Sequence, residues 1–188
     1  VTGVQTCALP IYGLAIARLL HTRGFGVTVY VIKNGAGKCS PDFMLNEKRL
    51  SESAGSSLFE IRDEADIPLI RSHDYVIDAL FGTGLAKIVT GLFEKLITTM
   101  NASGATVISI DVPSGLYTDH HTNGQAVVHA THTLSFEVPK LAFMFAENEK
   151  FVGQFHVLRI GLKHDFMEAL LTAKRSEEHT SELQSPCN

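Results

Sequence analysis

The sequence predicts an α/β protein whose mostly parallel sheet carries helices on both faces. Strand-like and helix-like segments alternate along the chain, which is the order of parallel strands joined by crossover helices. Residues 75–80 and 107–110 form two nearly continuous apolar runs, as expected for central strands covered on both faces. An acid and a tight turn accompany each run, and ligands bind at the carboxyl ends of parallel strands.

The spacing of apolar residues predicts the individual elements. Residues 12–23 carry an apolar stripe at helical spacing and stop at Gly24, which favours a helix end. Residues 91–100 repeat the amphipathic pattern, residues 42–52 show it more weakly, and residues 165–171 begin a last helix. Segments that are β-branched, aromatic or alternating are predicted as strands. They are 27–32, 58–62, 67–70, 75–80, 104–110, 126–136 (one or two strands) and 155–160.

Composition and charge exclude several classes of protein. The chain has 188 residues, 45% hydrophobic and 19% charged, with a net charge of −4, which is ordinary for one soluble globular domain. Neither nucleic acid nor a membrane surface is indicated as a partner, and no apolar run approaches the roughly 20 residues of a membrane span. Cys7, Cys39 and Cys187 form no disulfide framework, so the cytoplasm is the expected location.

The two ends of the chain differ from the rest. Residues 1–11 (VTGVQTCALPI) and 175–188 (RSEEHTSELQSPCN) resemble translated sequencing-library adapter, and foreign segments of this kind are excluded from fold reasoning. We therefore expect residues 12–174 to form the natural domain.

A glycine-rich turn follows the first apolar run. Gly82, Thr83 and Gly84 follow residues 75–80 after one intervening residue, Phe81. Glycines let backbone N–H groups approach a phosphate closely. The turn lacks the third glycine of a dinucleotide fingerprint and the Gly-Lys-Ser/Thr of a P-loop, so a phosphate site and a plain tight turn both stay open. Asp78 lies inside the run, and a buried carboxylate is paired, protonated or bound to a metal. A cation ligand and a structural acid that caps N–H groups are its two interpretations.

The second apolar run ends in Asp111, which is followed by Pro113, Ser114 and Gly115. An acid at the end of a central strand can act as a general acid or base in a cleft, whereas Asp before a proline turn is also ordinary turn chemistry. Ser114 lacks the G-x-S-x-G context of a nucleophile elbow, because Val112 occupies the first glycine position. The sequence therefore disfavours a hydrolase that uses Ser114 and a histidine, and favours Ser114 as an oxygen ligand for a hard cation.

Four histidines and a lysine follow this turn. They are His120, His121, His129, His132 and Lys140. His129 and His132 are three apart on a predicted strand and so face opposite sides, which argues against a shared zinc site. Lys140 either reaches the cleft or is solvated, and its chemistry alone favours the solvated side chain.

Four segments together resemble the YjeF N-terminal family, the NAD(P)H-hydrate epimerases. The segments are GLAIARLL (13–20), DALFGTGL (78–85), DVPSGL (111–116) and ATHTLSFEVPK (130–140). Their order and spacing match over nearly all of residues 13–162. The resemblance implies a Rossmann-like three-layer α/β/α sandwich that interconverts the R and S epimers of hydrated NADH and NADPH. It also implies a bound potassium ion, a homodimer in many members and, in two-domain members, a kinase-like dehydratase domain fused after the epimerase.

The resemblance assigns roles to particular residues. Asp78 and Ser114 are expected to bind one potassium ion, and Asp111 to contact the substrate near the reacting ring. The substrate contacts implied for the glycine-rich turn are Gly82, Thr83, Gly84, Leu85, Ala86, Lys87 and Ile88. The reacting carbon is a hemiaminal that loses its configuration when the hydroxyl leaves and water returns. That exchange needs an acid and a base, and Asp111 is the residue expected to supply both.

One segment departs from the family pattern. The family carries a GNNGGDG loop before its first helix, of which only Gly13 remains here, with Tyr12 in the position of the Asp. The loop supplies an Asn to the potassium ion and backbone donors to the phosphates, so we expect this chain to bind nucleotide weakly. A non-catalytic module that binds nucleotide or protein on the same fold is the alternative function.

Overall fold

A computed structural model of the chain describes residues 8–33, 40–52, 57–119, 121–122 and 124–161. The α-helices are α1 (Ala8–Thr22), α2 (Pro41–Glu52), α3 (Leu92–Ala102) and α4 (Glu149–Val152). The strands are β1 (Thr28–Val31), β2 (Ser57–Glu60), β3 (Tyr75–Asp78), β4 (Thr106–Ile110), β5 (His132–Phe136) and β6 (Gln154–Leu158). Three short 3-10 helices are η1 (Glu64–Asp66), η2 (Leu141–Met144) and η3 (Ala146–Asn148).

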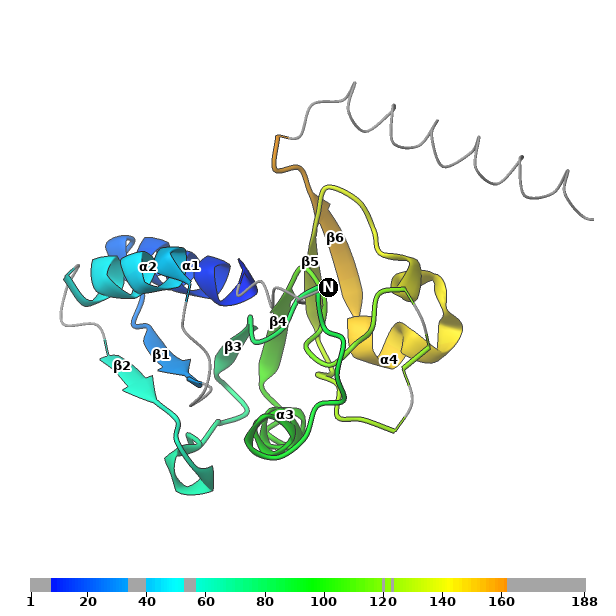
Figure 1. The fold of residues 1–188 in the computed structure, drawn as a ribbon, viewed down its shortest axis with the longest axis horizontal. Coiled ribbons are helices and arrows are strands. Elements are labelled where there is room, and N and C mark those ends of the chain that lie inside the picture. Colours follow the sequence, from blue (N-terminus) through cyan, green and yellow to red (C-terminus); the bar gives the residue numbers. More distant parts are fainter. Residues whose placement is uncertain (1–7, 34–39, 53–56, 120, 123, 162–188) are drawn as a thin grey trace, which may run out of the picture.

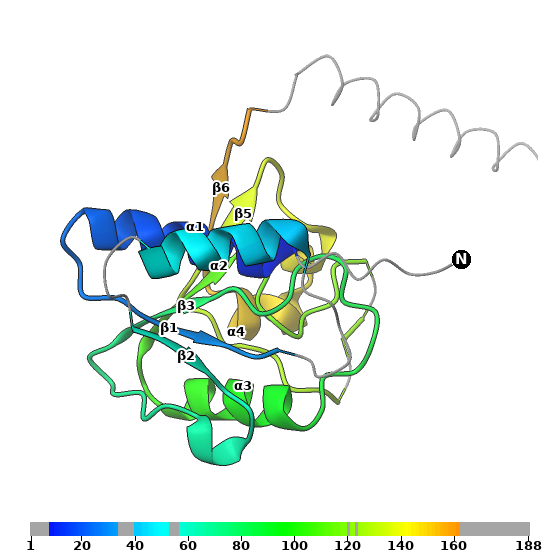
Figure 2. The same ribbon diagram turned by 60° about the vertical axis from the view of Figure 1, so that its left-hand side comes forward.

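Every strand pairing in this part of the chain is parallel. Strands β1 and β2 form one sheet, and β3, β4, β5 and β6 form a second sheet in that order. Figure 1 and Figure 2 show α1 and α2 side by side on one side of the strands and α3 on the other. The predicted α/β fold with a mostly parallel sheet between helical layers is confirmed.

Three apolar clusters hold the layers together. The first lies between α3 and the second sheet and includes Ile97, Val107 and Val128, all almost fully buried. The second fills the space between the turn after β4 and the η2–α4 region, and its buried members are Val112, Leu116, Val127, Ala142, Phe143 and Val152. The third joins α1 and α2 to β1 through Leu14, Ala17, Val31, Phe43 and Leu50. Helices α1 and α2 therefore rest mainly on the small sheet, whereas the large sheet has its own core.

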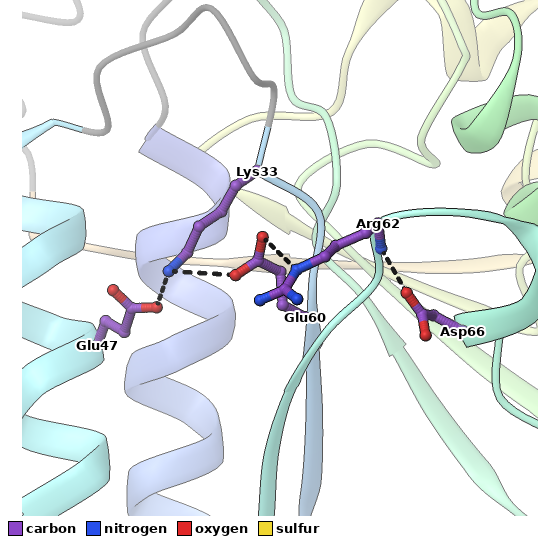
Figure 3. Close-up of polar contacts among 5 residues, drawn as sticks. All are labelled: Lys33, Glu47, Glu60, Arg62 and Asp66. Carbon is purple, nitrogen blue, oxygen red and sulfur yellow. Dashed lines mark hydrogen bonds and ion pairs between the residues drawn. The ribbon is translucent and has the colours of Figure 1, made fainter.

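Charged side chains fasten α2 to the carboxyl ends of β1 and β2 (Figure 3). The amine of Lys33, just after β1, lies 2.7 Å from Glu47 Oε1 on α2 and 4.0 Å from Glu60 Oε2 at the end of β2. Glu60 also pairs with Arg62 Nε at 3.3 Å, and the backbone N–H of Arg62 donates to Asp66 Oδ2 at 2.9 Å. These groups are partly exposed, so each pair contributes about 0–1 kcal/mol.

Most predicted elements form, with ends shifted by a few residues. Helix α1 begins at Ala8, ahead of the predicted start at residue 12. Pro10 is tolerated there because the first turn of a helix needs no N–H from it, and Ile11 packs on the third cluster. Residues 1–7 and 175–188, and the helix predicted at 165–171, lie outside the described residues.

One prediction of a strand is wrong. Residues 67–70 form irregular chain after η1, although Ile67 and Ile70 still pack on the first cluster. Residues 126–136, predicted to hold one or two strands, hold one, β5. Ahead of β5, a side chain bonds part of the backbone, because Asn101 Nδ2 donates to Val127 O and Asn101 Oδ1 accepts from His129 N, both at 2.8 Å.

In the described part of the chain, no helix is long and apolar enough to cross a membrane.

Candidate active site

The carboxyl ends of β3, β4 and β5 bring the predicted site residues to one edge of the large sheet. Asp78 is the last residue of β3 and is in register with Ser109 of β4. Asp111 directly follows β4, and its backbone N–H donates to Leu134 O of β5 at 2.8 Å. Parallel pairing thus places both predicted acids at the same edge, where ligands bind in sheets of this kind.

Asp78 is fully buried, with 1% of its surface exposed. Its Oδ1 accepts from the Ser114 hydroxyl at 2.6 Å and from Leu80 N at 3.4 Å. Its Oδ2 accepts from the Ser109 hydroxyl at 2.7 Å and from Ser114 N at 2.9 Å. Burial raises the pKa of the Asp78 carboxyl above its ordinary value of 3.8, although hydrogen bonds from Ser114, Ser109 and Leu80 act in the opposite direction.

Ser114 joins the turn after β3 to the turn after β4. Its hydroxyl donates to Asp78, and its oxygen accepts from Phe81 N at 2.9 Å. The backbone of Ser114 also contributes a donor to Asp78 at 2.9 Å and an acceptor to Val128 N, again at 2.9 Å. The predicted closeness of Asp78 and Ser114 is therefore confirmed, and their contact is a direct one.

The Asp78–Ser114 pair has the oxygen atoms that a hard cation prefers, but in this structure those oxygens are already used. A carboxylate has about four lone-pair positions, and the four donors to Asp78 fill them. A potassium ion would have to displace at least one of these hydrogen bonds, so the pair as folded does not fit a cation. Potassium binding stays a prediction, and no step below depends on it.

The glycine-rich turn leaves β3 next to this pair. Leu85 N donates to Gly82 O at 3.2 Å and closes a tight turn. Ser114 fixes the start of the turn at Phe81, and Gln125 Oε1 fixes its end by accepting from Val89 N at 3.1 Å. The predicted substrate contacts Thr83, Gly84, Ala86, Lys87 and Ile88 are exposed on this anchored turn, while Gly82 and Leu85 are half-buried. The turn is accessible to a ligand, and its contact with phosphates stays a prediction.

Asp111 sits in a strained turn. Its φ is +65°, and Val112 N donates to Ile110 O at 2.8 Å, which makes a γ-turn of the rare, strained kind. Such conformations cost about 1–3 kcal/mol and persist where the surroundings enforce them, often at functional sites. The turn directs the Asp111 side chain to β5, where Oδ1 accepts from Phe136 N at 3.0 Å.

Lys140 reaches this site, which is the alternative that the sequence interpretation did not favour. Its Nζ lies 2.9 Å from Asp111 Oδ1 and donates to Phe136 O at 3.1 Å, and its side chain is only 15% exposed. The prediction of a solvated side chain is wrong, because a second γ-turn reverses the chain after β5. In that turn Glu137 has a φ of +61° and Val138 N donates to Phe136 O at 2.7 Å. Lys140 is the last residue of the segment ATHTLSFEVPK and follows β5 as Asp111 follows β4, but residue types alone do not signal the reversal.

The described histidines named in the sequence analysis make their contacts away from this edge. His121 Nδ1 is 3.2 Å from Glu147 Oε1, and the His129 ring packs on Phe151. His132 of β5 faces His156 of β6, with 3.5 Å between Nδ1 and Nε2. His120 lies outside the described residues. The structure thus gives each described histidine a different neighbour, and none of these groups includes Asp111.

The start of α1 forms the remaining border of the site. The Tyr12 ring lies 4.9 Å from the Phe136 ring, centre to centre. A Cβ added at Gly13 would lie 3.0 Å from the Ala79 Cβ, a tight contact that a glycine avoids. The segment of α1 around Tyr12 and Gly13 therefore lies against Ala79, just after β3, and Phe136, the last residue of β5.

Comparisons with known proteins show the family of the chain. The family model described as "YjeF-related protein N-terminus" matches residues 12–142. NAD(P)H-hydrate epimerase of Limosilactobacillus fermentum is 32% identical over 142 residues, which are 76% of this chain and 65% of the relative. The "Bifunctional NAD(P)H-hydrate repair enzyme Nnr" of Thermofilum pendens is 31% identical over 172 residues, which are 90% of this chain and 32% of the relative.

A solved structure shares the fold. The crystal structure of yeast ynu0 superimposes with a TM-score of 0.60 at 21% identity, covering 82% of this chain and 63% of that one. The chain therefore spans about two thirds or less of the length of each of these proteins.

Proposed function

We propose a function from the premise that this chain belongs to the family of YjeF-related protein N-termini. The proposed activity is that of the relatives named NAD(P)H-hydrate epimerase: interconversion of the R and S forms of hydrated NADH and NADPH. One observation supports it most. Asp111, at the carboxyl end of β4, has one carboxylate oxygen held by Lys140 and Phe136, while the side chain keeps 10% exposure at the sheet edge.

The proposed chemistry needs only proton transfer. The reacting carbon carries a hydroxyl and a ring nitrogen. When an acid protonates the hydroxyl, the nitrogen lone pair helps to expel it as water and a planar iminium carbon remains. A water molecule then adds from either face and gives up a proton to the base. Asp111 gives its proton to the leaving hydroxyl as the acid and takes one back from the adding water as the base, so its carboxyl group ends in the state in which it began.

Asp78 acts indirectly in this proposal. Its carboxylate lies in the core and fastens the turns at 78–81 and 111–114 to each other. It thereby sets the distance between Asp111 and the exposed turn at 82–88, which we propose contacts the nucleotide phosphates through its backbone N–H groups. Misplacement of reacting groups by about 1 Å can cost about 100-fold in rate, so this fixed spacing matters.

An epimerisation assay on Asp111→Asn tests the proposal. The variant keeps the size of the side chain and removes its ability to exchange a proton. We expect kcat for interconversion of purified NADH-hydrate epimers, followed by chromatography or NMR, to fall about 10²- to 10⁴-fold. Dinucleotide binding, measured by calorimetry, should stay unchanged. Asp119→Asn is the matched control, because Asp119 is an exposed acid beyond the site.

The results of this assay distinguish an epimerase from a non-catalytic binding module on the same fold. Full activity in Asp111→Asn would overturn the catalytic assignment. Dinucleotide binding without any epimerisation by the unsubstituted chain would favour the non-catalytic binding module. Running the assay in potassium, sodium and choline salts tests the predicted potassium ion independently. A higher rate in potassium alone would support the ion, and equal rates in the three salts would agree with the occupied oxygens of Asp78.

We further propose that a kinase-like dehydratase domain is a natural partner of this domain. The support is that two relatives, from Thermofilum pendens and Coxiella burnetii, are named as bifunctional repair enzymes and match this chain over 32% of their length. Coding sequence for such a domain downstream of this one in the source genome would establish the fusion.

A further inference from the structure

Lys140 holds Asp111 but has no role in the proposed proton transfer. Both described contacts of the Asp111 carboxylate are made by Oδ1, which accepts from Lys140 Nζ at 2.9 Å and from Phe136 N at 3.0 Å. Within the described part of the chain, no group hydrogen-bonds to Oδ2. We propose that Lys140 is the positioning residue that fixes Asp111 with Oδ2 facing the substrate, an inference that rests on the proposed function.

A single turn supplies both donors to Oδ1. Phe136 offers its N–H, and its carbonyl accepts from Lys140 Nζ at 3.1 Å. The γ-turn at Glu137, with a φ of +61°, brings Lys140 back over Phe136. Two donors on one oxygen stop the carboxylate from rotating about its terminal torsion, which is otherwise broad. The charged donor is the stronger of the two, because a hydrogen bond between ions is roughly twice as strong as a neutral one.

The contacts of Lys140 argue against a direct role in holding substrate phosphates. An ammonium has three N–H donors. Here Nζ lies near three oxygens: Asp111 Oδ1 at 2.9 Å, Phe136 O at 3.1 Å and Val138 O at 3.5 Å. The side chain is 15% exposed. An anion would have to take Nζ away from these acceptors, so Lys140 is directed to Asp111 and not to a ligand.

Lys140→Ala should lower kcat for epimerisation about 10- to 100-fold with little change in KM, because the proton-transferring oxygen loses its orientation. Added ethylamine or propylamine should restore part of kcat in a saturable way, since a free ammonium can occupy the vacated position. A purely structural role of the lysine would show as a lower Tm without amine rescue. Lys48→Ala is the control, because Lys48 is an exposed lysine on α2 with a 71% exposed side chain.

Two kinetic results would overturn the inference: a rise in KM at unchanged kcat, which would make Lys140 a substrate contact, and a kcat equal to that of the unsubstituted chain.

A labelling experiment tests the pairing without turnover. In the unsubstituted chain, acetylation of Lys140 by acetic anhydride, followed by mass spectrometry, should be at least about 10-fold slower than that of Lys48, because its amine is paired and shielded. In Asp111→Asn this difference should shrink. Equal labelling of the two lysines in the unsubstituted chain would overturn the positioning role. Absence of epimerisation alongside Asp111-dependent protection would instead count against the proposed function.

Discussion

At the scale of single residues, the buried carboxylate of Asp78 makes stability depend on its donors. Ser114→Ala removes the hydroxyl that donates to Asp78 at 2.6 Å and accepts from Phe81 N at 2.9 Å. A buried charge and a backbone N–H both lose a partner, so we expect the free energy of unfolding to fall by about 2–3 kcal/mol. Urea unfolding followed by circular dichroism measures this.

Ser109→Ala is the matched control for that substitution. It removes one hydroxyl donor to the same carboxylate, at 2.7 Å, and nothing else. Its cost should be about 1–2 kcal/mol, smaller than that of Ser114→Ala. An equal or larger loss in Ser109→Ala would contradict the view that Ser114 joins the two turns.

The raised pKa of Asp78 predicts a pH dependence of stability. The native state binds the Asp78 proton more tightly than the unfolded state does, because burial penalises the charged form. The stabilisation from this group is therefore complete below pH 3.8 and is lost as the pH rises through the raised native pKa. The side chain at position 78 in Asp78→Asn does not titrate. The unfolding free energy of the unsubstituted chain should therefore fall relative to that of Asp78→Asn as the pH rises.

Urea unfolding of both proteins at a series of pH values, in potassium-free buffer, measures this difference. A constant difference across the series would show that the Asp78 pKa is the same in both states. Repeating the series in potassium chloride adds a test of the predicted ion, because a bound cation favours the ionised carboxylate and would lessen the loss.

Residue types at strand ends could be predicted from the sequence, whereas the direction of Lys140 could not. Asp78 and Ser114 lie where strand order and short turns place them, so apolar periodicity was enough to bring them together. The position of Lys140 depends on a φ of +61° at Glu137, a conformation that non-glycine residues rarely adopt. Lysine side chains are usually exposed to solvent, and a prediction from residue type alone is wrong where such a turn folds the lysine back onto the protein.

At the scale of elements, the turn after β4 depends on Gly115. Its φ is +97°, and an added Cβ would lie within 3.0 Å of Val127 Cα and closer still to the carbonyl oxygen of Ala126. Both neighbours are backbone and cannot move aside cheaply. We expect Gly115→Ala to lower the unfolding free energy by about 3 kcal/mol or more.

Gly24→Ala is the control for Gly115→Ala. Gly24 also has a positive φ, +85°, but nothing lies within 4 Å of its added Cβ. The strain of a left-handed alanine alone costs about 1–2 kcal/mol. Denaturation of the two variants therefore separates close approach from backbone strain, and similar losses would contradict the predicted clash.

Two strand-like segments that lie outside the strands show what a single sequence does not reveal. Residues 126–131 have the composition of a strand, but the side chain of Asn101 in α3 bonds Val127 O and His129 N, where a neighbouring strand could have paired. Residues 67–70 bury two isoleucines without pairing. In both cases the apolar residues were correctly assigned to the core, and the missing information was which group satisfies the backbone.

At the scale of the whole molecule, two sheets rather than one give the fold two regions of unequal stability. Strand β4 lies inside the large sheet, with Val107, Ser109 and Ile110 at 0–2% exposure. Strands β1 and β2 pair only with each other among the described residues, and Tyr30 and Phe59 stack on a face where they stay 39% and 52% exposed. The small sheet therefore relies chiefly on α1 and α2 for its core.

This difference predicts unequal protection of backbone amides. Local opening of the β1–β2 ladder exposes less apolar surface than opening of β4, so its amides should exchange at least about 10-fold faster, a gap of about 1.4 kcal/mol in opening free energy. Native-state hydrogen exchange, read by NMR, compares both ladders in the same sample. Equal protection would show that α1 couples the two sheets into one cooperative unit. Faster exchange in β1–β2 would instead show that Asp78, Asp111 and Lys140 lie on the more stable of the two sheets. A catalytic site requires this, because its groups must be held within about 0.5 Å of the productive geometry.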